Sequence, residues 1–222
     1  MPRSMKIGAS ANGPSRLGGY LLFAAAIQFI LSMVAVQLAY PCHNGVCYNP
    51  LTNPISDLGN THTSALWPLF NYSLVLFGVL SFSGLLLLRS RLPGGSLGVV
   101  GVVALLVSLL GAIGVGVVPE NTILALHSIF ALTSFALSGL GILVLGLAAR
   151  REKTPGGFSP CSMAVGAFTL IALMVSLSPS FGLLAPWHTS GPGFGFGGIE
   201  RLVALPPILW LLILGFYFSR RR

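Results

Sequence analysis

Six long apolar stretches constrain the fold of this chain more than any other feature. A hydrocarbon core about 30 Å thick is crossed by roughly 20 residues of α-helix. In lipid the backbone must satisfy its own hydrogen bonds, so apolar stretches of this length are expected to be helical. We therefore predict an all-α polytopic membrane protein, a six-transmembrane-helix bundle with spans near residues 17–39, 66–88, 97–118, 123–149, 161–185 and 199–218.

The composition agrees with a membrane protein. The 222 residues are 54% hydrophobic and only 7% charged, whereas about a quarter of the residues in a soluble domain are charged. The links between the spans are mostly short, which excludes a separate soluble domain. We expect a tail at residues 1–16, a six-helix domain at 17–219 with an outer loop at 40–65, and a basic end at 220–222.

The charged residues are divided between the two ends of the predicted spans. One end carries eleven of the twelve lysines and arginines, with Arg201 as the exception, and the other end carries three of the four acidic residues and all four histidines. Short loops rich in Lys and Arg stay in the cytoplasm. We therefore predict a multi-pass protein of the cell membrane, with both termini cytoplasmic and the acidic residues outside.

The net charge of +8 does not indicate a nucleic-acid partner here. The basic residues are scattered over tails and inner links instead of forming one patch. In this distribution they determine topology and contact anionic membrane lipids. We expect membrane lipids as partners and no nucleic acid.

Two outer links, 40–65 and 186–198, are longer than a helical hairpin requires. Cys42 and Cys47 flank a short loop in the first of them, and Asn44-Gly45 between them supplies the positive φ angles of a tight turn. An outer compartment permits a disulfide, which is our prediction. Zinc binding or a redox role for the pair are the alternatives, although no second ligand pair is present. Cys161 is expected to be an inert apolar residue.

Ser56 and Asp57 lie in an outer segment, residues 53–60, that combines an acid, a hydroxyl and amides in a chain with few acids. Two interpretations remain open. Either residue could cap a short helix through backbone N–H groups, or the segment could have a functional role.

Glu120 and His127 lie before and just inside the predicted fourth span. On a helix His127 shares one stripe with Ala131, Ser134 and Ser138, a small and polar face that we expect to point into the bundle. An ionisable residue at this depth is by default a functional candidate. A neutral histidine hydrogen-bonded to a neighbour is the structural alternative.

Glu200 and Arg201 begin the last span. Arg201 is expected to pair with a carboxylate of Glu200, Asp57 or Glu120, which gives either a functional site or merely a salt-bridged helix start. Pro206 and Pro207 lack backbone donors and should kink this helix below the charged pair, which is one way to form a pocket.

These polar residues are all expected near the outer membrane surface. They would suit general acid–base chemistry, or a divalent metal held by imidazole and carboxylate groups. No short-spaced metal or nucleophile motif is present. The candidate catalytic residues are Asp57, His127, Glu200 and Arg201, and the candidate binding residues are Ser56, His62, Glu120 and His188.

The segment Asn53-Pro54-Ile55-Ser56-Asp57-Leu58-Gly59, together with His127 and with Gly198-Ile199-Glu200-Arg201, resembles a family of archaeal and bacterial membrane proteins catalogued as domain of unknown function 998. The resemblance covers residues from about 17 to 218. It implies a six-helix membrane fold and supplies no activity. The paired cysteines are not part of the family's general pattern.

Three classes of function remain open. An enzyme would act on a lipid or a small polar substrate, with Arg201 holding an anionic group. An accessory or scaffold subunit of a membrane complex, or a homo-oligomer, would use the polar residues only to hold its loops. A transporter of a weakly polar solute is disfavoured because the spans offer no carboxylate near the midplane. We expect Asp57→Ala and Arg201→Ala to be more damaging than substitution of Glu152, which we take to be exposed.

Overall fold

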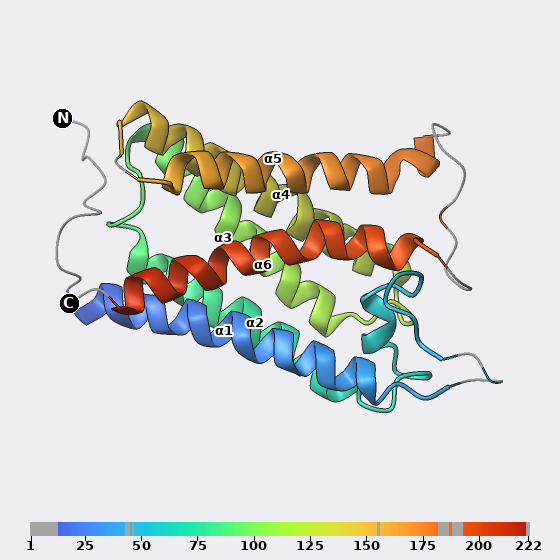
Figure 1. Ribbon diagram of the computed structural model, residues 1–222. Coiled ribbons are helices and arrows are strands. Elements are labelled where there is room, and N and C mark those ends of the chain that lie inside the picture. Colours follow the sequence, from blue (N-terminus) through green and yellow to red (C-terminus); the bar gives the residue numbers. More distant parts are fainter. Residues whose placement is uncertain are drawn as a thin grey trace.

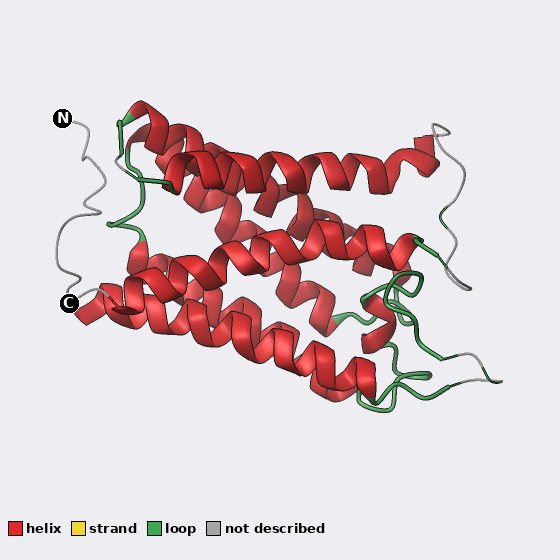
Figure 2. Ribbon diagram, viewed as in Figure 1, coloured by secondary structure: helices red, strands yellow, loops and turns green. Residues whose placement is uncertain are grey.

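The computed structural model describes residues 13–42, 45, 47–154, 156–181, 187 and 193–220, and helices are the only regular elements in this part of the chain (Figures 1 and 2). Six α-helices are each long and apolar enough to cross a membrane. Their bounds are α1 Gly13–Leu38, α2 Trp67–Leu88, α3 Gly95–Val117, α4 Leu124–Arg151, α5 Phe158–Leu177 and α6 Phe196–Arg220, with two short 3-10 helices, η1 Ser56–Gly59 and η2 Ser178–Phe181. The predicted all-α six-helix bundle is confirmed.

Five of the six predicted spans agree with the observed helices to within a few residues at each end. The fifth was wrong at its C-terminal end, because α5 stops at Leu177 and a 3-10 turn follows. Pro179 explains the early end, since proline has no backbone N–H to donate to the helical carbonyl four residues before it. The last residues of that prediction, 182–185, lie outside the described part of the chain.

The helices pack in a ring in the order of the sequence, and α6 closes the ring against α1. α4 also touches α6 directly. α5 therefore lies on the outside of the α4–α6 contact, where Ala172 and Leu173 pack against Val203 of α6. The interior of the bundle is enclosed mainly by the other five helices.

Glycines allow the helix backbones to approach closely. A Cβ atom on Gly18 would lie 2.8 Å from the carbonyl oxygen of Gly84, and one on Gly101 would lie 3.1 Å from that of Gly141. Such contacts between small residues are how helices associate in lipid. Gly19 and Gly215 join α1 to α6 in the same way, and Figure 1 shows these two helices meeting near the ends of the chain and diverging toward the other side.

The bundle has two chemically different ends. The basic end, where both α1 begins and α6 finishes, carries the described residues Arg16, Arg89, Arg91, Arg150, Arg151, Lys153 and Arg220. The opposite, acidic end carries Asp57, Glu120, Glu200 and Arg201. Glu152 at the basic end is partly buried, and one of its carboxylate oxygens accepts a hydrogen bond from the backbone N–H of Gly94 (2.9 Å). The expectation that Glu152 is exposed was therefore wrong.

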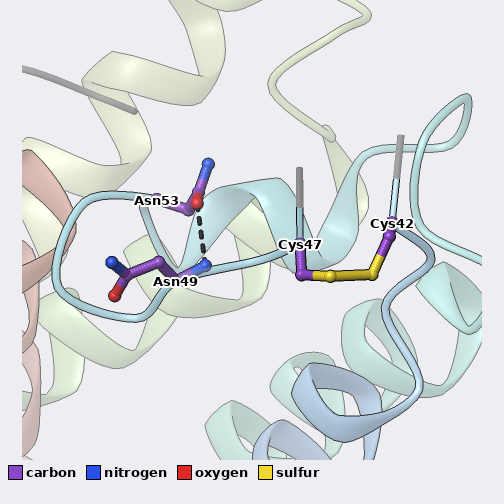
Figure 3. Close-up of a disulfide and its surroundings, with 4 residues drawn as sticks. All are labelled: Cys42, Cys47, Asn49 and Asn53. Atoms are coloured by element: carbon purple, nitrogen blue, oxygen red, sulfur yellow. Dashed lines mark hydrogen bonds between the residues drawn. A yellow bond between two sulfur atoms is a disulfide. The ribbon is translucent and has the colours of Figure 1, made fainter. Parts of the chain in front are cut away.

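The loop between α1 and α2 folds over the acidic end. Cys42 and Cys47 form the predicted disulfide, and Asn49 N donates to Asn53 Oδ1 over 2.9 Å (Figure 3). Gly45 has the positive φ, 79°, expected for the tight turn. Farther along, the loop is joined to the start of α6 by backbone hydrogen bonds, because the N–H groups of Gly195 and Gly198 donate to the carbonyl of Leu51 (2.9 and 2.7 Å) and that of Gly197 donates to Thr52 (3.0 Å). The first N–H groups of a helix have no partner inside the helix, and here the loop carbonyls accept from them.

Candidate functional site

Glu200 and Arg201, consecutive residues in the first turns of α6, hold the loop segment 53–56 from below. Glu200 accepts hydrogen bonds from the backbone N–H groups of Ile55 and Ser56 at the start of η1. Arg201 donates to the carbonyl of Asn53 (3.0 Å). The short helix in this segment is therefore capped by a side chain from α6, and the residue at its own N-cap position is Ile55, which contributes no side-chain hydrogen bond.

The four terminal N–H groups of the Arg201 guanidinium donate to neutral acceptors. Besides Asn53, its Nη1 donates to the carbonyl of Gly197 (3.0 Å), and its Nη2 donates to Gln37 Oε1 (3.1 Å) and to the hydroxyl of Tyr48 (2.6 Å). The guanidinium also lies 5.7 Å from the centre of the Tyr48 ring. No carboxylate of the described residues lies within ion-pair distance of it, so the expected salt bridge of Arg201 was wrong.

Tyr48 is a functional partner that sequence reasoning missed. Its hydroxyl donates to the carbonyl of Pro54 (2.8 Å) while it accepts from Arg201. Burial raises the pKa of the Tyr48 phenol, so the hydroxyl stays protonated and keeps its donor role. The signal in the sequence was its position directly after Cys47, because the predicted disulfide fixes the place of the residues that follow the short loop.

Asp57 and Glu120 form a pair of hydrogen-bonded carboxyl groups between η1 and the α3–α4 turn. Burial, and then the bond and negative charge of Glu120, raise the pKa of Asp57 to about 7. Two carboxyl groups can share a contact of this kind only while a proton lies between them. The same two loops are also joined by Asn121, whose Oδ1 accepts from Thr61 N (3.1 Å) and whose Nδ2 donates to Thr61 Oγ1 (2.8 Å).

A cavity of about 100 Å³ lies inside the bundle beneath this loop. Its walls come from α1, α2, α3, α4, α6 and the residues around η1, and α5 contributes none of them. Most of the lining is apolar, from Phe29, Ile55 and Phe70 at the acidic end to Leu85 and Ile142 deeper in the bundle. The polar lining residues are Ser56, Ser108, His127, Ser134, Ser138 and Glu200.

His127 is buried on the cavity wall, with 7% of its surface exposed. Its Nδ1 is 2.7 Å from the carbonyl oxygen of Val118. A carbonyl only accepts, so Nδ1 carries a proton in this contact. Among the described residues, Nε2 has no hydrogen-bond partner, and in the neutral ring it is an acceptor.

The predicted stripe of α4 faces the interior. Ala131, Ser134 and Ser138 line the cavity together with His127. Ser138 donates to the carbonyl of Phe135 in its own helix (3.0 Å), so its hydroxyl proton is already used. Pro207 of α6 also lines the cavity, and α6 continues as one helix through Pro206 and Pro207.

Not all of the predicted site residues come together. Glu200, His127 and Ser56 line the cavity, while Asp57, Glu120 and Arg201 hold the loop above it. His62 is exposed and is not part of the cavity wall, and His188 lies outside the described residues. Cys161 is exposed at the start of α5. Within the described ranges, no three His, Cys, Asp or Glu side chains come together as a set that could hold a metal ion.

Comparison with known proteins identifies the chain by its family alone. No curated protein and no solved structure matches it. The sequence model of one family matches residues 20–217, which is almost the whole helical domain. The chain therefore belongs to the family described as protein of unknown function DUF998.

Proposed function

We propose that this membrane protein binds a lipid-like amphiphile, with the apolar chain inside the helix bundle and the polar end beside Ser56, His127 and Glu200. We propose further that His127 Nε2 acts on that polar end as a general base, with the Glu200 carboxylate beside it as a second acceptor. A small polar substrate fits less well, because most of the cavity wall is hydrocarbon.

The observation that carries the proposal is the distribution of side chains along the cavity. On α4, the lining residues extend from His127 to Ile142, a distance of about 22 Å at the rise of an α-helix. The ionisable lining residues, His127 and Glu200, lie with Ser56 at the end nearest the acidic surface. Below them apolar side chains dominate, and the hydroxyls of Ser108 and Ser138 donate to carbonyls of their own helices. An apolar cavity in a protein stays dry and accepts apolar groups, so this shape matches one polar end and one hydrocarbon chain.

The proposed roles follow from the hydrogen bonds of each residue. His127 Nε2 is an acceptor directed by the Nδ1 bond to Val118, an arrangement that prepares an imidazole to take a proton. The Glu200 carboxylate is fixed by Ile55 and Ser56 while it lines the cavity. Arg201, Asp57 and Glu120 act as positioning residues, because they hold the segment that carries Ser56.

Proton transfer is a better proposal than metal-assisted chemistry for this site. It requires only the two groups on the cavity wall, whereas a metal ion needs a larger set of donors. Asp57 and Glu120, which could supply further oxygen ligands, are bonded to each other above the cavity.

The orientation in the membrane is also a proposal. The basic residues at the end shared by the helix termini support a cytoplasmic location for both termini in the cell membrane. The polar end of the ligand would then lie near the outer surface. The contacts by which Glu200 and Arg201 hold the loop segment 53–56 would also suit an accessory subunit. A scaffold, however, has no need of a cavity lined by ionisable side chains.

Filling the cavity tests the proposal. The wild-type protein, Ala131→Phe and Ala125→Phe would each be purified in nanodiscs, and the lipids retained after extensive exchange would be identified by mass spectrometry. Ala131 lines the cavity, whereas Ala125 is an exposed residue of the same helix. We expect wild type and Ala125→Phe to retain one class of amphiphile that Ala131→Phe has lost. Retention of that class by all three proteins would overturn the proposal.

A further inference from the structure

We infer that the cavity selects a single-chain amphiphile whose polar end donates hydrogen bonds, a hydroxyl or an ammonium group, and rejects carboxylate and phosphate ends. The inference rests on the proposed function and adds the chemical class of the ligand. It contradicts the sequence-based expectation that Arg201 holds an anionic group.

The first reason is that the cation of the acidic end is fully engaged. The four terminal N–H groups of Arg201 bind Asn53, Gly197, Gln37 and Tyr48. Arg201 does not line the cavity, and no other Lys or Arg of the described residues lies at this end of the bundle. Among the described residues, a ligand anion would therefore find no lysine or arginine side chain on the cavity wall.

The second reason is that the cavity wall presents acceptors at its polar end. The Glu200 carboxylate accepts from two backbone N–H groups and has lone pairs remaining, since two oxygens offer about four acceptor sites. The proton of His127 is used by Val118, which leaves Nε2 to accept. Ser56 contributes one hydroxyl, which can donate or accept. A donor group on the ligand satisfies these acceptors.

The third reason is the cost of bringing a second anion to this place. A ligand carboxylate or phosphate would lie beside Glu200 and below the Asp57–Glu120 pair, inside an apolar bundle. Like charges repel strongly where the effective dielectric constant is low. An ammonium group would instead be attracted, and a hydroxyl would be neutral.

The dimensions of the cavity indicate one chain. A volume of about 100 Å³ distributed along about 22 Å of α4 describes a narrow space. The tails of a two-chain phospholipid would need a wider one.

A competition series tests the inference. Radiolabelled dodecylamine would be equilibrated at pH 7 with the protein in phosphatidylcholine nanodiscs, with unlabelled dodecylamine, dodecanol, dodecanoate and dodecyl phosphate as competitors. Ala131→Phe nanodiscs would measure the background of partitioning into lipid. We expect the amine and the alcohol to displace the label at concentrations about tenfold or more below those of the two anions, a difference of about 1.4 kcal/mol.

The possible outcomes separate the two proposals. Stronger displacement by dodecanoate or dodecyl phosphate than by dodecanol would overturn the inference, while the cavity would remain a site for amphiphiles. Equal retention of label by wild type and Ala131→Phe, with displacement by no competitor, would overturn the proposed function itself.

A charge-removing variant adds an independent measurement. Glu200→Gln keeps the size of the side chain and an acceptor oxygen for Ile55, and it should remove the preference for dodecylamine over dodecanol. Glu152→Gln, at the basic end, is the matched control and should keep that preference. An unchanged preference in Glu200→Gln would contradict the inference, and if this variant does not fold, the order of competitors on the wild-type protein still decides.

Discussion

Glu200 and Arg201 bind opposite polarities of one loop segment, the carboxylate accepting from Ile55 and Ser56 and the guanidinium donating to Asn53. Backbone N–H and C=O groups in an irregular segment lack the partners that a helix would give them. Here two consecutive charged side chains supply these hydrogen-bond partners. This explains why acid and base occur together at the start of α6 without forming an ion pair with each other.

Removal of the Arg201 side chain should loosen the loop. Arg201→Ala removes one donor from each of two carbonyls, an amide oxygen and a phenol, and a buried polar group left unsatisfied costs about 1–3 kcal/mol. We expect a clearly lower melting temperature and faster proteolysis within residues 47–60. Thermal unfolding in detergent would measure the first effect and limited proteolysis the second.

The control for Arg201→Ala is Arg151→Ala, because Arg151 is an exposed arginine of the basic end. Substitution of Glu152 by alanine is unsuitable as the control, because it would remove the acceptor of the Gly94 N–H group. Equal melting temperatures for the two arginine variants would contradict the role assigned to Arg201.

The contact between Asp57 and Glu120 should weaken as the pH rises. Folding raises the pKa of Asp57 from the ordinary carboxyl value near 4 to about 7. The stability from this contact is therefore complete below about pH 4 and is lost as the pH rises through about 7. We expect faster hydrogen exchange in residues 55–62 at pH 8 than at pH 6, after correction for the intrinsic rate.

Asp57→Asn supplies the control for the pH measurement, because an amide does not titrate. Its exchange in residues 55–62 should be nearly the same at both pH values, and the 89–94 link should show no difference in either protein. A pH effect of equal size in Asp57→Asn would exclude this pair as its source.

A larger side chain at the α3–α4 contact should destabilise the bundle. A Cβ atom on Gly141 would lie 2.9 Å from the carbonyl oxygen of Gly101 and 2.8 Å from Leu105 Cγ. Overpacking of this kind costs about 1–3 kcal/mol. Gly141→Leu should therefore unfold at a lower temperature, whereas Gly157→Ala, where the space is open, should be close to wild type.

Loss of the disulfide should have a local effect. The bond between Cys42 and Cys47 closes a very short loop, for which the entropic contribution is roughly 2 kcal/mol or less. In Cys42→Ser/Cys47→Ser we expect faster exchange in residues 40–50 and unchanged retention of the cavity ligand. Ligand loss in the double variant would show that the disulfide also maintains the cavity.

The helices could be predicted from the sequence because lipid permits few alternatives. Long apolar stretches specify spans directly, and only the C-terminal end of α5 differed, where Pro179 ends the helix inside an apolar stretch. The residues of the acidic end were predicted from charge alone, since Glu200 and Asp57 had to lie on the same side.

The partners of those residues could not be predicted. Arg201 binds the carbonyl of Asn53, and every residue of the loop offers a carbonyl, so the sequence gives no preference for this one. The choice depends on the path of the loop in space. The cavity escaped prediction for a related reason, because its wall is assembled from five helices and is continuous only after they pack.

Hydrogen bonds from backbone and side chains join loop residues 51–56, which lie above the cavity, to the first turns of α6. Below these turns, Pro206 and Pro207 leave the carbonyls of Leu202 and Val203 without their helical donors, so α6 bends most easily there. A bend of α6 at these prolines would therefore move the loop segment 53–56 together with the first turns of the helix, and the lining residues Ile55, Ser56 and Glu200 would keep their mutual positions.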